Sequence, residues 1–385
     1  MKIKGYVREN GEIGIRNHVA IIPASVCASE TAQQISDQVE GTVALPHQHG
    51  CCQIGRDSEI VIETLAGLGR NPNVASVLII GLGCEGAEPH KIKSLIEDTK
   101  KTIETITIQE CGGTLKTIEQ GTRIARNLVN TKEQMERKDV DISELTLGIE
   151  CGGSDATSGI ASNPSTGEAS DLLLEKGGTS ILSETTELIG AEHVLAKRAE
   201  NQEVSDKLYE IVNRTEQKAL EMGVDIRGGQ PTPGNIEGGV TTIEEKSLGC
   251  IYKAGSAPVK GVLEFGERPD DKGLYVMDTP GQDIESITGM LAGGAQIIVF
   301  TTGRGTPTGS PIAPVIKVTG NSKTYENMVD NIDINAGKVV SGEMTLQEQG
   351  KEIFDEMVRV SNGKLTKGEI LKHQEFALFR LCQTF

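Results

Sequence analysis

Short apolar segments that run into glycine-rich loops recur along the first third of this chain, and a segment with helical periodicity follows each one. The clearest, 74–80, is rich in valine and isoleucine and leads into Gly81-Leu82-Gly83-Cys84-Glu85-Gly86. A short apolar run that ends in glycines is typical of a buried strand. Repetition of strand, loop and helix predicts a parallel sheet with helices on its faces. We expect strands at 18–26, 42–45, 74–80 and 105–108, and helices near 28–40, 57–68, 88–100 and 115–129.

The length of 385 residues predicts more than one domain. Because segment 130–143 is charged, we expect a Rossmann-like α/β domain at 1–140 and a second α/β domain, with long Gly- and Pro-rich loops, at 141–385. The expected fold class is α/β, with two domains, mostly parallel Rossmann-like sheets and helices on both faces. In the second domain the expected strands are 145–147, 179–182, 274–277 and 296–300, and the expected helices are 167–176, 191–222, 323–330 and 346–360.

Charge and hydropathy exclude several classes of protein. The net charge of −17 argues against nucleic-acid binding, because phosphate contacts need clustered Lys and Arg. No apolar run of about 18 residues is present, so no membrane span is expected. The first residues lack the apolar region of a signal peptide, and we therefore expect a cytoplasmic protein. In that compartment the eight cysteines are expected to be thiols or metal ligands rather than disulfides.

Thiols and carboxylates gather in loops that follow three of the predicted strands. His47 and Cys51 follow the second strand, Cys84-Glu85 follows the third, and Glu150-Cys151 follows the strand at 145–147. Ligands that converge from separate loops indicate a metal centre with an open position. Mixed Cys, His and carboxylate ligands suit Fe(II), Zn or an iron–sulfur cluster better than Mg or Ca, and the sequence leaves these alternatives open. Polar turns with buried thiols are the simpler alternative.

Other residues are candidates for substrate binding or proton transfer. Arg304 lies in a loop rich in Gly and Thr, where a guanidinium can bind a carboxylate through two hydrogen bonds, and a surface arginine is the equal alternative. The candidate bases for proton transfer are His18, His193 and Lys246. For each of them a structural or solvent-exposed role is at least as common. Three cysteines in apolar surroundings are expected to be structural: Cys27, Cys250 and Cys382.

Several motifs spread along nearly the whole chain are specific when taken together. They include Gly14-Ile15-Arg16-Asn17, Gly81-Leu82-Gly83-Cys84-Glu85, Glu150-Cys151-Gly152-Gly153-Ser154-Asp155, Pro233-Gly234-Asn235 and Phe300-Thr301-Thr302-Gly303-Arg304-Gly305. In these motifs the chain resembles the large, catalytic part of the altronate/galactarate dehydratase family, which includes the large subunit of (2R)-sulfolactate sulfo-lyase. Members of this family eliminate a β-leaving group from a 2-hydroxy acid, usually water from a sugar acid, with iron.

The resemblance implies a hydro-lyase that converts an altronate- or galactarate-like sugar acid into a 2-keto-3-deoxy acid. The runner-up is a sulfo-lyase that releases sulfite and pyruvate, and a non-catalytic sugar-acid-binding protein is a third alternative. The implied cofactor is Fe(II), with Mn(II) or a [4Fe–4S] cluster as alternatives. Single-chain members begin with a small β-rich SAF domain that we do not find here. A separate small SAF-domain subunit is therefore an expected partner, and we also expect a homo-oligomer.

These motifs and the resemblance together assign expected roles to residues of a site at the domain junction. The expected metal ligands are His47, Cys51, Cys84, Glu85 and Cys151. The expected substrate-binding residues are Ser154, Asp155, Asn163, Asn235, Thr302 and Arg304. The expected catalytic residues are His18, His193 and Lys246. Most of these residues belong to 141–385, which is therefore the expected catalytic domain.

Overall fold

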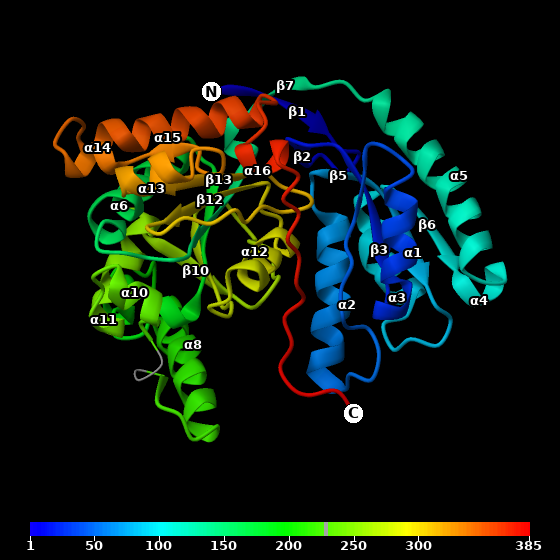
Figure 1. The fold of residues 1–385 in the computed structure, drawn as a ribbon, viewed down its shortest axis with the longest axis horizontal. Helices are drawn as coiled ribbons and strands as arrows, with labels where there is room; N and C mark the ends of the chain where they lie inside the picture. Colours follow the sequence, from blue (N-terminus) through cyan, green and yellow to red (C-terminus); the bar gives the residue numbers. More distant parts are fainter. Residues whose placement is uncertain (227–229) are drawn as a thin grey trace.

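The computed structural model describes residues 1–226 and 230–385 and contains two parallel β-sheets flanked by helices (Figure 1). The first sheet has the strand order β4-β3-β5-β6. Its strands are β3 (His18–Pro23), β4 (Thr42–Ala44), β5 (Val74–Gly81) and β6 (Thr102–Thr107). Its helices are α1 (Val26–Ser36), α2 (Gly55–Arg70), α3 (Pro89–Ile96), α4 (Ile108–Cys111) and α5 (Thr114–Glu133). The predicted repetition of strand, loop and helix is confirmed.

Alternate side chains of the first sheet face opposite layers of helices. Val19 and Ile21 of β3 pack with residues of α1 and α5, whereas Ala20 and Ile22 pack with residues of α2 and α3. Successive side chains of a strand point to opposite faces, so a strand that is apolar at every position must be covered on both. The expected coverage of both faces is therefore present.

The second sheet has seven strands, all parallel, in the order β10-β11-β9-β8-β12-β13-β14. The strands are β8 (Thr146–Cys151), β9 (Thr179–Leu182), β10 (Val259–Leu263), β11 (Leu274–Met277), β12 (Ile297–Thr302), β13 (Val315–Thr319) and β14 (Ile334–Asn335). The sequence predicted β8, β9, β11 and β12 only. Lys317 interrupts the apolar pattern of β13, yet its side chain is buried and its Nζ donates a hydrogen bond to the Thr308 carbonyl oxygen at 3.0 Å.

The helices of the second sheet again cover both faces. Residues of α6 and α15 pack on one face, and residues of α12 pack on the other. The predicted helix over 191–222 is divided into α7 and α8. No helix in the two described ranges is long and apolar enough to cross a membrane. The bounds are α6 (Asn163–Leu174), α7 (Glu192–Ala196), α8 (Gln202–Glu221), α10 (Pro233–Glu237), α11 (Ile243–Cys250), α12 (Asp283–Ala292), α13 (Ser322–Asn327), α14 (Gly337–Val340), α15 (Leu346–Ser361) and α16 (Lys367–Ile370).

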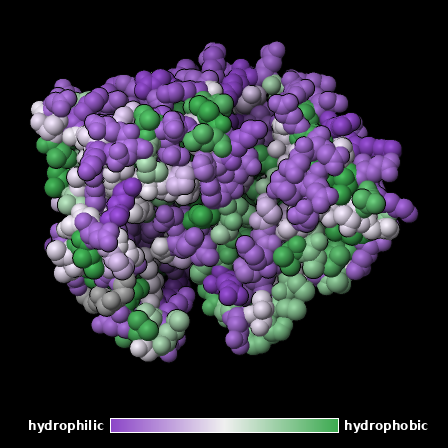
Figure 2. Space-filling model, in the orientation of Figure 1, coloured by the Kyte–Doolittle hydropathy of each residue, from purple (hydrophilic) through white to green (hydrophobic). Residues whose placement is uncertain are grey.

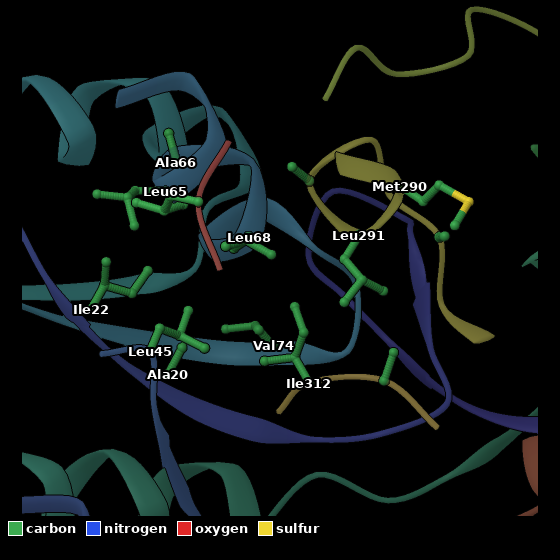
Figure 3. Packing of buried hydrophobic residues seen from close by; sticks show 14 of the residues in the cluster. Ala20, Ile22, Leu45, Leu65, Ala66, Leu68, Val74, Met290, Leu291 and Ile312 are labelled. Atoms are coloured by element: carbon green, nitrogen blue, oxygen red, sulfur yellow. The ribbon is translucent and has the colours of Figure 1, made fainter. Parts of the chain in front are cut away.

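The two sheets are joined through α2 and α12, which pack against each other (Figure 3). Leu65 and Leu68 on α2 belong to the same buried hydrophobic cluster as Met290 and Leu291 on α12. A Cβ at Gly67 of α2 would lie 2.8 Å from the carbonyl oxygen of residue 292, so glycine permits the close approach of the two helices. This shared core fixes the two sheets relative to each other.

A small antiparallel sheet, β2-β1-β7, ties the start of the chain to the boundary segment. It consists of β1 (Lys2–Val7), β2 (Ile13–Gly14) and β7 (Lys138–Asp141). The charged segment 130–143 was expected to be a linker, but it contains the end of α5 and all of β7. Lys138 and Asp139 of β7 are exposed, and Asp139 forms an ion pair at 2.8 Å with Lys4 of the neighbouring β1. A charged edge strand is a common way to avoid unwanted pairing, and it hides the strand from pattern analysis.

The strand order of the second sheet reverses direction at β8. From β8 the chain places β9, β10 and β11 on one side, and it then returns to place β12, β13 and β14 on the other. Because β8 and β12 are neighbouring parallel strands, the loops that follow them begin side by side at the carboxyl edge of the sheet, and the chain then continues from them toward opposite sides. In open α/β sheets, a crevice at such a switch point is where ligands bind.

Candidate active site

The loops that follow β8 and β12 meet at this switch point. The carbonyl oxygen of Gly153 accepts hydrogen bonds from the backbone N–H groups of Gly303 at 3.2 Å and Arg304 at 2.9 Å. A Cβ at Gly303 would lie 2.2 Å from Cγ of Asp155, so a larger residue would push the loops apart. Glycine at this position therefore brings the two loops into contact.

A buried cluster of charged and thiol groups lies at the carboxyl end of β8, and Lys253 is at its centre. Lys253 Nζ donates hydrogen bonds to Glu187 Oε2 at 2.6 Å, Cys151 Sγ at 2.8 Å and Glu184 Oε2 at 3.2 Å. Only 1% of the Lys253 side chain is exposed. A buried ammonium is tolerated only where acceptors compensate for its lost hydration, and here three acceptors do so.

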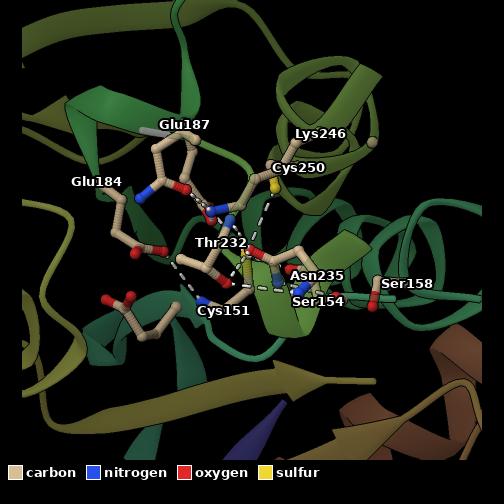
Figure 4. Close-up of polar contacts among 12 residues, drawn as sticks. Cys151, Ser154, Ser158, Glu184, Glu187, Thr232, Asn235, Lys246 and Cys250 are labelled. Carbon is tan, nitrogen blue, oxygen red and sulfur yellow. Dashed lines mark hydrogen bonds and ion pairs between the residues drawn. The ribbon is translucent and has the colours of Figure 1, made fainter. Parts of the chain in front are cut away.

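Lys246 and Cys250 complete this cluster from one helix (Figure 4). Lys246 Nζ lies 3.4 Å from Glu187 Oε1, and Cys250 Sγ lies 3.6 Å from Cys151 Sγ. Residues 246, 250 and 253 are spaced by four and then three positions along α11 and the 3₁₀ turn that continues it, η5 (Ile251–Ala254). This spacing places the three side chains on one helical face.

A group of carboxylates adjoins the cluster. One oxygen from each of Glu150, Glu184 and Asp283 lies within 4.8 Å of the other two. Glu150 Oε2 accepts hydrogen bonds from the hydroxyls of Ser183 at 2.8 Å and Ser286 at 2.6 Å. Glu184 has a φ of 66°, in the left-handed region that non-glycine residues rarely adopt. Strained backbone of this kind is common at functional sites.

Burial and neighbouring charge shift the pKa values of these groups in different directions. Burial raises the pKa of Glu150 to about 7, and burial together with the charges of Glu150 and Glu187 raises the pKa of Glu184 well above its usual range. For Glu187, burial is outweighed by Lys253 and Lys246, which lower its pKa. Burial acts to lower the pKa of both lysines, but Cys151, Glu187 and Glu184 raise the pKa of Lys253, and Glu187 above all raises that of Lys246. Glu187 and the two lysines are therefore charged at neutral pH.

Several predicted substrate-binding residues lie beside this cluster and hold the surrounding loops. Asn235 Nδ2 donates a hydrogen bond to the carbonyl oxygen of Ser154 at 2.9 Å, and the Ser154 hydroxyl lies 3.9 Å from Cys151 Sγ. Asp155 Oδ2 accepts a hydrogen bond from Asn321 Nδ2 at 3.0 Å. The β8 loop is therefore held from two sides, by α10 and by the loop that follows β13.

The remaining predicted substrate-binding residues lie along the carboxyl end of β12. Asn163 Oδ1 accepts a hydrogen bond from the hydroxyl of Thr301 at 2.6 Å, and Thr302 Oγ1 accepts one from a backbone N–H at 2.9 Å. The Arg304 side chain is 45% exposed and extends toward α10. Its Nη1 lies 3.1 Å from Oε2 of Glu237 and donates a hydrogen bond to the carbonyl oxygen of residue 234 at 3.0 Å.

Two of the predicted first-domain metal ligands are occupied by backbone groups. His47 is buried, its Nε2 lies 2.8 Å from the Pro23 carbonyl oxygen, and its Nδ1 accepts the backbone N–H of residue 49 at 3.1 Å. The Glu85 carboxylate accepts the backbone N–H groups of Leu82 at 3.1 Å, Gly83 at 2.6 Å and Cys84 at 3.0 Å. In this arrangement both side chains stabilise their loops, and neither belongs to the group of close ligand atoms that contains Cys151.

The two predicted cysteine ligands of the first domain also lie apart from Cys151. Cys84 is exposed, and Cys51 is half-buried with its Sγ 3.7 Å from the Sγ of Cys52. Within the described ranges, Cys151 is the one predicted metal ligand that belongs to a group of three or more His, Cys, Asp or Glu side chains with ligand atoms within 4.8 Å of one another. The expected convergence of first-domain ligands on Cys151 is therefore not present in this structure.

The three predicted bases lie in different places. Lys246 belongs to the buried cluster. His18 opens β3, so it lies at the amino edge of the first sheet, opposite the glycine-rich loops, and burial lowers its pKa to about 4. His193 is exposed on α7. The positions of His18 and His193 do not fit the predicted role of a base at this cluster.

Sequence reasoning missed Glu184, Glu187 and Lys253, and it treated Cys250 as structural. Signals for these residues were nevertheless present. The two glutamates lie in the loop after the buried strand β9, just as Glu150 and Cys151 lie at the end of β8. Ligand-binding residues of a parallel sheet lie at the carboxyl ends of its strands, so this position was a signal. Cys250 and Lys253 extend a polar stripe that begins at Lys246.

A group of side chains made of Cys151, Glu187 and Cys250 fits a transition metal ion. Ligand atoms from Cys151, Glu187 and Cys250 lie within 4.8 Å of one another, and all three residues are buried. Thiolates favour Fe and Zn over Mg and Ca, and a carboxylate completes a mixed donor set. Two thiols fall short of the three or four that a [4Fe–4S] cluster needs, so the donor set favours a single ion.

Comparison with known proteins gives matches along nearly the entire chain. The family described as D-galactarate/altronate dehydratase, C-terminal, matches residues 142–384. The family described as D-galactarate dehydratase/altronate hydrolase, second domain, matches residues 5–133.

Individual relatives cover the chain with substantial identity. The (2R)-sulfolactate sulfo-lyase subunit beta of Chromohalobacter salexigens is 40% identical over 99% of this chain and 97% of its own length. The altronate dehydratase of Bacillus subtilis is 35% identical over 98% of this chain and 77% of its own length. The galactarate dehydratase (L-threo-forming) of Escherichia coli is 35% identical over 94% of this chain and 73% of its own length.

Proposed function

The chain belongs to the D-galactarate/altronate dehydratase family and is a lyase, and from this premise we propose that it removes water from a sugar acid resembling altronate or galactarate. The product would be a 2-keto-3-deoxy acid. The observation that carries this proposal is the buried cluster at the carboxyl end of β8, in which Lys253 contacts Cys151, Glu184 and Glu187. A protein that only bound sugar acids would gain nothing from burying so many charged groups.

We propose that the buried lysines supply positive charge to the reaction. Removal of the α-proton next to a carboxylate builds negative charge on the substrate, and preorganised cations in a water-excluded site stabilise that charge. Lys253 touches three members of the cluster and positions them. Lys246 is less buried, with 14% of its side chain exposed, and its ammonium can hold a proton for the departing hydroxyl. The partly exposed carboxylate of Asp283 takes the α-proton, and Lys246 gives a proton to the departing β-hydroxyl, which leaves as water. The enol that remains becomes the 2-keto acid.

We propose that Cys151, Cys250 and Glu187 hold the metal ion, in place of a set drawn from His47, Cys51, Cys84 and Glu85. Fe(II) is the proposed ion, and Mn(II) is the alternative. When bound, such an ion supplies a Lewis acid that polarises the substrate's carboxylate or hydroxyl oxygen. Support comes from the donor set and its burial in the described part of the chain.

We propose Arg304 as the clamp for the substrate carboxylate. Its side chain is 45% exposed, and its guanidinium donates a hydrogen bond to the carbonyl oxygen of residue 234 at 3.0 Å. In this structure the carboxylate of Glu237 pairs with Arg304 at 3.1 Å, and a substrate carboxylate would replace Glu237 in that pair. A bidentate guanidinium–carboxylate pair gives orientation as well as affinity.

A second candidate function is the release of sulfite from (2R)-sulfolactate. It is favoured by one comparison, in which the sulfo-lyase subunit beta matches over 97% of its own length, against 77% for the altronate dehydratase of Bacillus subtilis. The words "subunit beta" indicate that this relative works in an assembly. We therefore also propose a separate small subunit as partner of this chain.

A turnover assay tests these proposals. The protein is prepared anaerobically, loaded with Fe(II) and incubated with altronate, galactarate or (2R)-sulfolactate, with and without a small SAF-domain subunit. A 2-keto acid from a sugar acid supports the hydro-lyase, and sulfite from sulfolactate supports the sulfo-lyase. Cys151→Ser and Lys246→Met should abolish turnover, whereas Cys382→Ser, which changes an exposed cysteine, should not. Absence of turnover with all three substrates would contradict both functions.

A further inference from the structure

Two adjacent cysteines in the loop after β4 have thiols in contact. The Sγ atoms of Cys51 and Cys52 are 3.7 Å apart, and Cys52 is exposed while Cys51 is half-buried. Among the described residues, the other pair of thiols in contact is Cys151 and Cys250, and both of these are buried. Cys51 and Cys52 are therefore the thiol pair that a dissolved oxidant can reach.

Cys51 also changes the protonation of its neighbour. Its hydrogen bond and its charge raise the pKa of Cys52. When two acids interact in this way, the pair gives up one proton before the other. A thiolate beside a protonated thiol is suited to thiol–disulfide exchange, because the thiolate attacks the oxidant and the second thiol then resolves the mixed disulfide.

A disulfide between these two neighbours in the sequence is within reach, but it is strained. Rotation of the two side chains has to bring the sulfur atoms from 3.7 Å to about 2.05 Å. The Cα atoms of adjacent residues are about 3.8 Å apart, which is less than the ~4.4–6.8 Å of ordinary disulfides. A strained and exposed disulfide is easily reduced, which is a property of regulatory disulfides rather than structural ones.

We propose that Cys51 and Cys52 form a reversible vicinal disulfide that controls the attachment of the C-terminal tail, and that a small disulfide of the glutathione type is the oxidant. The Cys51 thiolate attacks one sulfur of the oxidant and expels the first reduced thiol. The Cys52 sulfur then attacks the Cys51 sulfur, forms the S–S bond and expels the second. The two cysteines lose two electrons and two protons, and the oxidant takes up both.

The same loop holds the end of the C-terminal tail, which is residues 371–385. The backbone N–H of Phe385 donates a hydrogen bond to the Cys52 carbonyl oxygen at 2.9 Å, and that of Leu381 donates one to Asp57 Oδ1 at 2.6 Å. Residues 380–385 are all exposed, so little apolar burial adds to these two hydrogen bonds. In Figure 1 the tail passes between the two domains and ends beside the start of α2.

Closure of the ring acts on the contact with Phe385. The ring includes the ψ torsion of Cys51 and the φ torsion of Cys52, and the Cys52 carbonyl group turns with the latter. Cys52 has a φ of 59°, in the left-handed region that a non-glycine residue adopts at a cost. We expect the closed ring to change this torsion and to weaken the hydrogen bond to Phe385.

The tail also lines a cavity between the domains. Phe379 and Leu381 form part of the wall of a cavity of about 420 Å³, which residues of α2 and α8 line as well. Figure 2 shows the surface hollowed between α8 and α2. Oxidation of the two cysteines would therefore loosen one side of this cavity.

Titration with glutathione tests the thiol site without substrate. The reduced full chain is equilibrated anaerobically at increasing ratios of glutathione disulfide to glutathione, free thiols are alkylated, and tryptic peptides are analysed by mass spectrometry. We expect peptide 17–56 to lose the alkylation sites of Cys51 and Cys52 together, to keep that of Cys27, and to regain both with dithiothreitol. Cys52→Ser should stop at the mixed disulfide of Cys51, and Cys382→Ser should behave as the wild type does.

Limited digestion with trypsin tests the response of the tail. Cleavage after the exposed Arg380 should be roughly 2- to 10-fold faster in the oxidised than in the reduced protein, because one hydrogen bond of the tail is lost. In Cys52→Ser the oxidant should leave the rate unchanged.

Three results would overturn the inference. Full alkylation of Cys51 and Cys52 at every glutathione ratio would show that the ring does not form. A disulfide from either residue to Cys382 would replace the vicinal pair by a bond between loop and tail. An unchanged rate of cleavage after Arg380, with the vicinal disulfide formed, would show that the tail does not respond to it.

Discussion

Replacement of His47 by Gln separates a structural role of this residue from the role of metal ligand. The imidazole is 3% exposed, and both its nitrogens contact backbone groups, at 2.8 Å and 3.1 Å. Burial lowers its pKa from the usual 6.5 to about 4. The unfolded chain therefore binds more protons than the folded chain between these pH values, and the stabilisation present above pH 6.5 is lost as the pH falls toward 4. At ~1.4 kcal/mol per pKa unit, the loss from this one group is about 3 kcal/mol.

The assay is denaturant unfolding at pH 7, 6, 5 and 4.5 in the presence of chelator. His47→Gln should cost about 1–3 kcal/mol at pH 7, because one backbone group loses its partner. The gap to the wild type should close toward pH 4.5, since the variant has no buried imidazole to protonate. His90→Gln, at an exposed position, should give a curve parallel to the wild type. A constant gap for His47→Gln across this range, together with less bound iron than the wild type in chelator-free preparations at pH 7, would refute the structural role and restore the metal ligand.

Three further substitutions test other parts of the site. Lys253→Met should lower the free energy of unfolding by about 3–5 kcal/mol, because it leaves the carboxylate of Glu187 buried without its nearest cation. The control Lys207→Met, which removes an exposed ion pair, should lower it by less than about 1 kcal/mol. Thermal melting measures both losses, and equal losses would contradict this role of Lys253. Glu85→Gln should lower stability by roughly 1–3 kcal/mol and leave the bound iron unchanged, and a loss of iron in metal analysis would contradict the loop-stabilising role. Arg304→Lys should raise the KM for a sugar acid more than it lowers kcat, because a lysine cannot make the bidentate pair, and steady-state kinetics that show the reverse would argue against a clamp.

Patterns with strong local periodicity predicted the fold well. The strands β5 and β12 contain the continuous apolar segments 77–80 and 297–300 because both faces of their sheets are covered, and such segments are visible in a sequence. The strands that escaped prediction lack this property. β7 is a charged edge strand, and β14 has two residues. In both cases the stability comes from partners distant in the chain, which local pattern cannot show.

The site was only partly predictable, for a reason that lies in the architecture. The sequence placed Cys51 and Cys84 after strands of the first domain and Cys151 after a strand of the second, but it did not show how the two domains pack against each other. Carboxyl edges of the same sheet gather their loops, whereas edges of two sheets meet only if the domains pack edge to edge. Here the domains pack through the helices α2 and α12, and the loops of the first sheet stay apart from Cys151.

One residue of the proposed ligand set, Cys250, comes from a helix, and this explains why it was overlooked. Cys250 looked structural because its neighbours are apolar, and its side chain is indeed buried, as is that of Lys253, which the sequence reasoning did not consider. Whether a buried residue on a helix belongs to the core or to a site depends on the side chains that face it from the neighbouring element. For Lys253 these side chains are a pair of carboxylates at the edge of the second sheet, and a lysine on a buried helical face has no stable state without such a partner. A buried stripe of Lys, Cys and Lys at helical spacing therefore predicts an acidic partner even before its position is known.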